Sequence, residues 1–171
     1  NGSVIFEKPT SDEKTFDGNR ALVLLLEDNV IQSHPWGKLY KASFIKNICF
    51  PEYLKSFEDY STLFKVFDKA VKVAKSNDKL YHYIQHEDSL SHNLTPEYAY
   101  YFYTAIMEVF EFWQNTTLQE NKNKITKNII RKLLMVTKRI LRNTSKEEMK
   151  IEKEKIRTSF KTFHNYPIKD I

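Results

Sequence analysis

The sequence contains few of the residues on which several common kinds of site depend. Its 171 residues include a single cysteine, Cys49, which cannot form an internal disulfide, and three glycines, which are too few for a phosphate-cradling loop. No run of about 18 apolar residues occurs, so no membrane-spanning helix is expected. The chain opens without a signal segment, and together with the lone thiol this predicts a reducing, cytoplasmic setting.

The five histidines do not show the spacing of a metal site. His86 and His92 are too far apart in "HEDSLSH" to share a helical face, and no pair of histidines lies beside cysteines or carboxylates at zinc-site spacing. Cys49 lies between Ile48 and Phe50, and this position suits a small buried hydrophobic residue better than a nucleophile. The sequence therefore predicts no metal bound by these residues and no cysteine chemistry.

The overall composition is that of a globular domain. Hydrophobic residues make up 41% of the chain and aromatic residues 14%, enough to build a core. The net charge of +5 suits an anionic partner such as a phosphate-bearing substrate or a membrane surface. Nucleic acid is not expected, because the basic residues are dispersed and no docking motif is present.

The patterns along the chain predict a mainly α fold with a short β-hairpin. Residues 20–27 have the composition of a short buried helix, with Asp17 or Asn19 as its cap, although a buried strand has the same apolar pattern. Residues 71–86 read as a strand, a Ser-Asn-Asp turn and a second strand, with Leu80, His82 and Ile84 facing one way.

The region after residue 94 is predicted to be entirely helical. Thr95 and Pro96 open a helix rich in aromatic residues up to Trp113, which suits core packing better than a stacking platform for bases or sugars. A second helix, around residues 124–142, has one apolar and one basic face. The apolar face comprises Ile125, Ile129, Ile130, Leu133, Leu134, Ile140 and Leu141, and the basic face Lys127, Arg131, Lys138 and Arg142. The basic face is either a solvated surface or an interfacial face for anionic lipid. A third, charged helix is predicted from Thr144.

Two adjacent carboxylates, Glu58 and Asp59, occur where another helix should begin. Ser56 is a suitable N-cap, and acids in the first turn favour the positive end of the helix dipole. The same carboxylates could instead take a proton from a substrate. Taken alone, these residues favour the capping interpretation.

Residues 34–91 together resemble the C-terminal part of the catalytic domain of bacterial family 2 glycosyltransferases. That family shows a Trp-x-Lys-Leu-Tyr segment, a Phe-Pro-Glu segment, Glu-Asp opening a helix, a strand ending in tyrosines and a Ser-x-Ser close. The matching residues occur in this order: Trp36, Lys38, Leu39, Tyr40, Lys41, Phe50, Pro51, Glu52, Glu58, Asp59, Leu80, Tyr81, Tyr83, Ser89 and Ser91.

The resemblance implies the C-terminal portion of an α/β GT-A fold, residues 1–93, followed by a helical extension, residues 94–171. In such enzymes a Rossmann-like half binds the nucleotide sugar, and an Asp-x-Asp segment holds Mg or Mn against the diphosphate. Neither feature occurs in this sequence. The chain is therefore expected to be the acceptor-side fragment of a larger enzyme, inactive alone and binding no metal itself.

The resemblance also implies roles for individual residues. Asp59, with Glu58 beside it, matches the position of the general base of an inverting transfer. Trp36, Lys38 and Tyr40 are the implied substrate-binding residues, although Trp36 could equally anchor its loop and Lys38 face solvent. Many relatives carry an arginine after the tyrosines. Here Ile84 takes that position, and His86, two residues on, is a candidate replacement.

The sequence thus predicts part of an enzyme that transfers a sugar from a nucleotide-sugar donor to a saccharide or lipid-linked acceptor. Surface polysaccharide assembly at the inner face of the membrane is the expected context. The alternative is a helical interaction or membrane-surface module in which the basic helix from Lys124 to Arg142 contacts anionic lipid.

Overall fold

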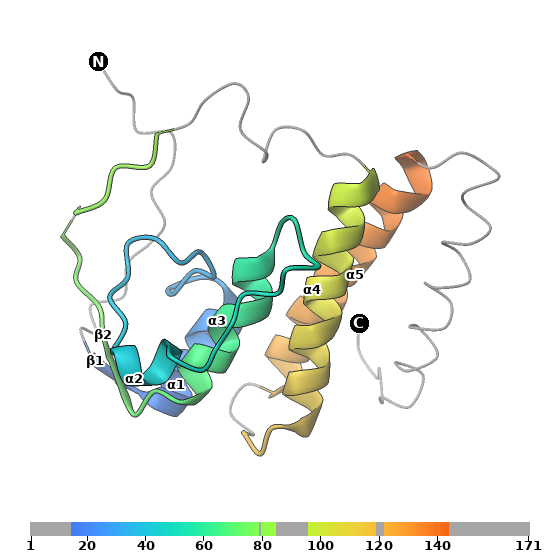
Figure 1. Ribbon diagram of the computed structural model, residues 1–171. Coiled ribbons are helices and arrows are strands. Elements are labelled where there is room, and N and C mark those ends of the chain that lie inside the picture. The colour runs from blue at the N-terminus through green and yellow to red at the C-terminus, as the bar shows by residue number, and fades with distance from the viewer. Residues whose placement is uncertain (1–14, 79, 85–95, 119–121, 144–171) are drawn as a thin grey trace.

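Helices dominate the part of the chain that the computed structural model describes, residues 15–78, 80–84, 96–118 and 122–143 (Figure 1). The elements are β1 (Thr15–Asp17), α1 (Gly18–Glu27), α2 (Ala42–Ile45), α3 (Glu58–Asp68), β2 (Lys72–Ala74), α4 (Pro96–Asn115) and α5 (Lys122–Asn143). A mainly α fold with one short antiparallel pair of strands is therefore confirmed.

Helix α1 is the buried helix predicted around residues 20–27. Its N-cap is Asp17, whose Oδ1 accepts a hydrogen bond from Arg20 N at 3.0 Å. Its residues 21–26 are all buried, which explains why its sequence is apolar on every side. The helix ends at Asp28, which has left-handed backbone geometry (φ 52°) and whose N–H donates to Leu25 O at 2.9 Å.

The two strands come from distant parts of the chain. β1 pairs antiparallel with β2, with Phe16 opposite Val73. The hairpin expected within residues 71–86 is therefore correct for its first strand, which is β2. It is wrong for the second, because the partner of β2 is β1. Pairing with β1 takes Phe16 into the core, at 2% exposure, whereas Leu80 and Ile84 remain exposed.

Helix α3 begins one residue later than a Ser56 cap would place it. Phe57 occupies the N-cap position with a left-handed φ of 64°, and no side chain caps the helix. The side chain of Ser56 hydrogen-bonds to the Tyr98 side chain on α4 and does not cap α3. The buried face of this helix includes Tyr60, Phe64 and Phe67, whereas Val71 lies beyond the end of the helix and is exposed.

Helices α4 and α5 lie side by side and pack against α1 and α3 (Figure 1). The core interpretation of the α4 aromatics is confirmed for Phe110 and Trp113, which are 1% exposed, whereas Tyr98, Tyr101 and Phe102 are only partly buried. On α5 the predicted apolar face is buried at Ile125, Ile129, Ile130 and Leu133 but wrong at Leu134, which is 47% exposed. One continuous core therefore joins residues of the two predicted segments, 1–93 and 94–171.

Two further observations bear on the expectations from sequence. Cys49 is exposed, not buried as its apolar neighbours suggested. His86, His92 and the helix predicted from Thr144 lie outside the described residues. No helix in the described ranges combines the length and the hydropathy that crossing a bilayer requires.

Candidate functional site

The predicted substrate-binding residues Trp36, Lys38 and Tyr40 lie on one irregular segment between α1 and α2. The ring of Trp36 stacks on His34, with centroids 3.4 Å apart and planes 1° from parallel. It also stacks with Tyr81 and Tyr83 at 5.0 and 4.9 Å. These three ring contacts fix Trp36 against its own loop and against residues 80–84, which favours the anchoring role left open from sequence.

The ring nitrogens of His34 contact three polar neighbours. Its Nε2 lies 2.7 Å from Gln32 Oε1, and its Nδ1 lies 3.3 Å from the Lys38 ammonium. A proton on Nε2 suits Gln32 Oε1 and the Lys38 ammonium, whereas the Trp36 carbonyl oxygen, 3.2 Å from Nδ1, accepts a hydrogen bond only from a protonated Nδ1. Burial, and then the positive charge of Lys38, lower the pKa of His34 to about 4, so the ring is neutral at physiological pH.

Lys38 is tied back to the same loop and lies near two carboxylates. Its ammonium donates to the backbone oxygen of His34. Burial lowers the pKa of Lys38 to about 8, against the opposing influence of Asp28 and Asp59. Lys38 therefore stays mostly protonated at pH 7 and loses its charge within a pH range that an assay can reach.

Asp59 lies in the first turn of α3 with its carboxylate partly buried. Its Oδ1 accepts a hydrogen bond from Tyr60 N at 2.6 Å, so the acid does bond to one free backbone amide of that turn. Burial raises the pKa of Asp59, and the negative charges of Glu58 and Asp28 add to this; the Tyr60 N–H bond opposes it. The result is a carboxylate that is more basic than an ordinary aspartate.

Tyr40 completes the group of predicted residues that the fold brings together. Its hydroxyl donates to Pro35 O at 3.3 Å, and burial followed by the charge of Asp59 raises the pKa of Tyr40 to about 12. Lys38 and Tyr40 thus both lie within electrostatic range of Asp59. Glu58 adjoins Asp59, and the remaining predicted site residue, His86, is outside the described part of the chain.

Three residues of this region were missed by the sequence interpretation. Asp28 caps α1, and its carboxylate pairs at 3.0 Å with the ammonium of Lys132 from α5, which also lies 3.4 Å from the Tyr60 hydroxyl. One signal could have revealed Lys132. It follows Ile125 and Ile129 at the i, i+4, i+7 spacing of the buried stripe, where a lysine requires a partner.

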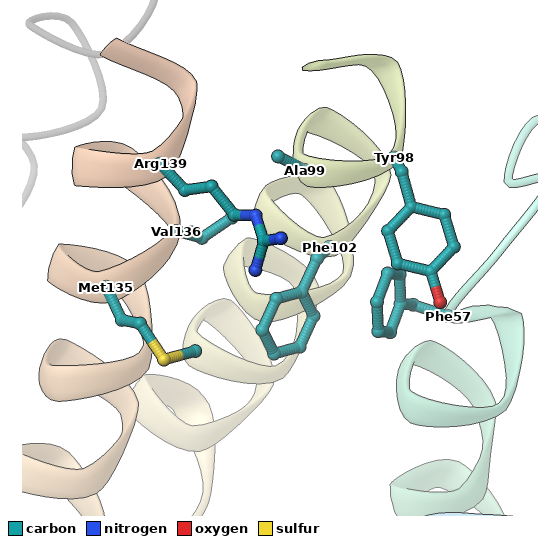
Figure 2. A pocket seen from close by; sticks show the side chains of 7 residues that line it. All are labelled: Phe57, Tyr98, Ala99, Phe102, Met135, Val136 and Arg139. Carbon is teal, nitrogen blue, oxygen red and sulfur yellow. The ribbon is translucent and has the colours of Figure 1, made fainter. Parts of the chain in front are cut away.

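A small apolar cavity of about 160 Å³ adjoins the start of α3 (Figure 2). The side chains that line it come from α4, α5 and the residue before α3. They are Phe57, Tyr98, Ala99, Phe102, Met135, Val136 and Arg139. A cavity of this volume accommodates a benzene-sized group. It is distinct from the charged group around Asp59, although Phe57 is two residues from that acid.

The described residues do not bring together three or more His, Cys, Asp or Glu side chains that could hold a metal ion. They therefore do not fit a divalent cation, which the resemblance places on an Asp-x-Asp segment that this sequence lacks. Comparisons with protein-family models, with curated proteins and with solved structures found nothing that matches the chain.

Proposed function

We propose that these residues form the acceptor side of an inverting glycosyltransferase, with Asp59 as the general base. The observation that carries the proposal is the convergence of Lys38, Tyr40 and Asp59. The family resemblance selected these residues, and in the fold Asp59 acts electrostatically on both Lys38 and Tyr40 although up to 21 positions separate them. The donor nucleotide sugar and its metal would be bound by residues other than those described.

The local chemistry suits this role. A base must be unprotonated yet basic enough to accept the proton of an attacking hydroxyl, and burial moves the pKa of Asp59 upward in that direction. Lys38 supplies a nearby positive charge that can stabilise negative charge on a departing diphosphate. Trp36, stacked on three rings, contributes by fixing the loop that carries Lys38.

The apolar surface next to the site is also consistent with a missing neighbour. Leu39 is fully exposed, and Leu80 and Ile84 are 82% and 71% exposed. The two segments that carry these residues lie together, since Trp36 stacks on Tyr81 and Tyr83. Exposed apolar side chains on two neighbouring segments suit an interface, and the donor-binding half of the enzyme would cover them.

The test is sugar transfer by the intact polypeptide that contains these residues. A panel of nucleotide sugars is offered with saccharide and lipid-linked acceptors, and nucleoside diphosphate release is measured. Asp59→Asn keeps the shape and the acceptor oxygen for Tyr60 N but removes the base. We expect turnover to fall by roughly 10²–10⁴-fold, the usual contribution of general base catalysis, with the KM for the donor little changed.

The matched control is Asp68→Asn, which removes an exposed aspartate at the other end of the same helix. It should leave turnover near the wild-type value. If Asp59→Asn retained most of the wild-type turnover, Asp59 would be a helix-terminus residue without a catalytic role. The 171-residue chain alone is expected to transfer no sugar.

A second candidate function rests on a specific feature of α5. Lys127, Arg131, Lys138 and Arg142 are exposed and lie on one face of the helix, with the exposed side chain of Leu134 among them and that of Met135 at its edge. A basic face with apolar side chains suits the headgroup region of an anionic membrane. Both functions are compatible, and cosedimentation with anionic vesicles tests the second.

A further inference from the structure

Lys132 connects three elements through one ammonium group. Its side chain projects from α5, is 17% exposed, and lies 3.0 Å from Asp28 Oδ2 at the end of α1. The same Nζ lies 3.4 Å from the Tyr60 hydroxyl of α3 and 4.7 Å from the centroid of the Tyr60 ring. An ammonium that combines an ion pair, a hydrogen bond and a ring contact is held in a defined position.

Each partner of Lys132 is joined directly to a part of the candidate site. Tyr60 follows Asp59, and its backbone N–H donates to the Asp59 carboxylate. The second carboxylate oxygen of Asp28, Oδ1, accepts from Ser33 N at 3.2 Å, at the start of the loop that carries His34, Trp36 and Lys38. Lys132 is therefore linked through Tyr60 to the proposed base, Asp59, and through Asp28 to the loop that carries Lys38.

Charged groups of both signs surround Lys132. Asp28, Asp59 and Glu58 are acidic, and Lys38 and Lys132 are basic. Asp28 favours the protonated form of Asp59 through like-charge repulsion, and the ion pair with Lys132 limits that effect. The other titratable groups that act on these residues are His34, Tyr40, Tyr60 and Tyr98.

We propose that Lys132 is a positioning residue for the Asp59 site, acting through Asp28 and Tyr60, so that α5 contributes to the site without touching the substrate. The idea that Asp59 is the base rests on the proposed function. The coupling between Lys132 and Asp59 does not, and it can be measured without turnover.

The experiment is an NMR titration of the Asp59 carboxyl carbon in the 171-residue chain, with the resonance assigned by its loss in Asp59→Asn. Lys132→Met keeps the stem of the side chain and removes the positive charge that pairs with Asp28. We expect the Asp59 titration midpoint to rise by about 0.5–1 pH unit, as removal of a nearby charge typically produces. Lys132→Arg should restore the wild-type midpoint, because the charge returns.

The matched control is Lys124→Met. Lys124 is on the same helix and pairs with Glu27 at 3.0 Å, next to Asp28, but it is 68% exposed. Its loss should leave the Asp59 midpoint unchanged. An unchanged midpoint in folded Lys132→Met would overturn the proposal, as would an equal shift in Lys124→Met, which would indicate a general charge effect.

A second variant covers the case in which Lys132→Met does not fold. Asp28→Asn keeps the Ser33 contact geometry and leaves the Lys132 charge in place, so the Asp59 midpoint should fall by a similar amount. A midpoint that stayed at the wild-type value would also overturn the proposal. If the Asp59 midpoint did not shift but Asp59→Asn lost turnover, only the role of Lys132 would be rejected. If the midpoint shifted as expected but Asp59→Asn kept its turnover, only the catalytic role of Asp59 would be rejected.

Discussion

At the residue scale, the most informative side chain is Asp59. Its carboxylate is partly buried beside Glu58 and within range of Asp28, and burial raises its pKa. Keeping such a group charged at neutral pH costs stability. Packing does not require a charged group at this position, because a neutral side chain could accept the same hydrogen bond from Tyr60 N. Unfavourable charges of this kind cluster at functional sites.

Asp59→Asn should therefore stabilise the fold at neutral pH. Because the pKa of Asp59 is higher in the folded state than in the unfolded chain, the folded state binds protons more tightly. The protonated Asp59 side chain therefore contributes to the stability of the fold at low pH, and this contribution is lost as the pH rises through the folded-state pKa. At pH 7 we expect Asp59→Asn to gain about 0.5–2 kcal/mol, and the gain should vanish below about pH 4.

Urea unfolding at pH 7 and pH 4 measures this difference. Asp68→Asn, at an exposed position, should stay within about 0.5 kcal/mol of wild type at either pH. A loss of stability in Asp59→Asn at pH 7 would mean that the charged carboxylate is needed to stabilise the start of α3, which is the capping interpretation.

At the element scale, local signals in the sequence were sufficient for most helices and insufficient for the sheet. Asp17 as a cap and the apolar run after it defined α1, and the aromatic stripe defined the buried face of α4. The partner of β2 could not be inferred, because alternation identifies a strand but not the strand beside it. The choice depended on burying Phe16, more than 50 positions away from Val73.

The close contact between α1 and the approach to β2 depends on Gly18. Its N–H donates to Val71 O at 2.8 Å, and a Cβ at this position would lie 1.7 Å from Ala70 O. Gly18→Ala must therefore separate the two segments, and we expect a loss of about 3 kcal/mol, at the upper end of overpacking costs. Chemical denaturation of the purified variant measures this loss.

Gly37→Ala is the control for loss of a glycine as such. Gly37 has a positive φ of 66°, but its nearest neighbour, Tyr81 Cβ, would be 3.8 Å from the added carbon. Backbone strain alone should cost roughly 1 kcal/mol. If Gly18→Ala proved no more destabilising than Gly37→Ala, the packing of α1 against residues 70 and 71 would be looser than the distances indicate.

At the scale of the whole molecule, α5 has two faces with different tasks. Its inner face closes the core and anchors the end of α1, where Asn128 Nδ2 donates to Leu26 O and Glu27 O at 3.3 and 3.2 Å and Lys132 holds Asp28. These contacts span about one hundred positions, so sequence order could suggest Lys38, Tyr40 and Asp59 but not the residues that hold them. The outer face carries the exposed basic residues of α5, which make no contribution to the core.

That outer face predicts binding to anionic membranes. Each basic residue near an anionic surface contributes about 1 kcal/mol, so four should produce measurable binding to vesicles that contain phosphatidylserine, and little to phosphatidylcholine alone. We expect binding to be lost at about 1 M salt, where the Debye length is near 3 Å. Leu134→Ser should weaken it further, because the exposed Leu134 side chain can insert between headgroups.

The decisive comparison is between two variants with the same loss of charge. One replaces the basic residues of the outer face with glutamine, at Lys127, Arg131, Lys138 and Arg142. The other replaces four exposed lysines elsewhere, Lys41, Lys46, Lys69 and Lys72. In vesicle cosedimentation the first variant should lose more than about one hundredfold in affinity and the second only a minor part. Equal losses would show that net charge, and not the outer face of α5, attracts the protein to the membrane.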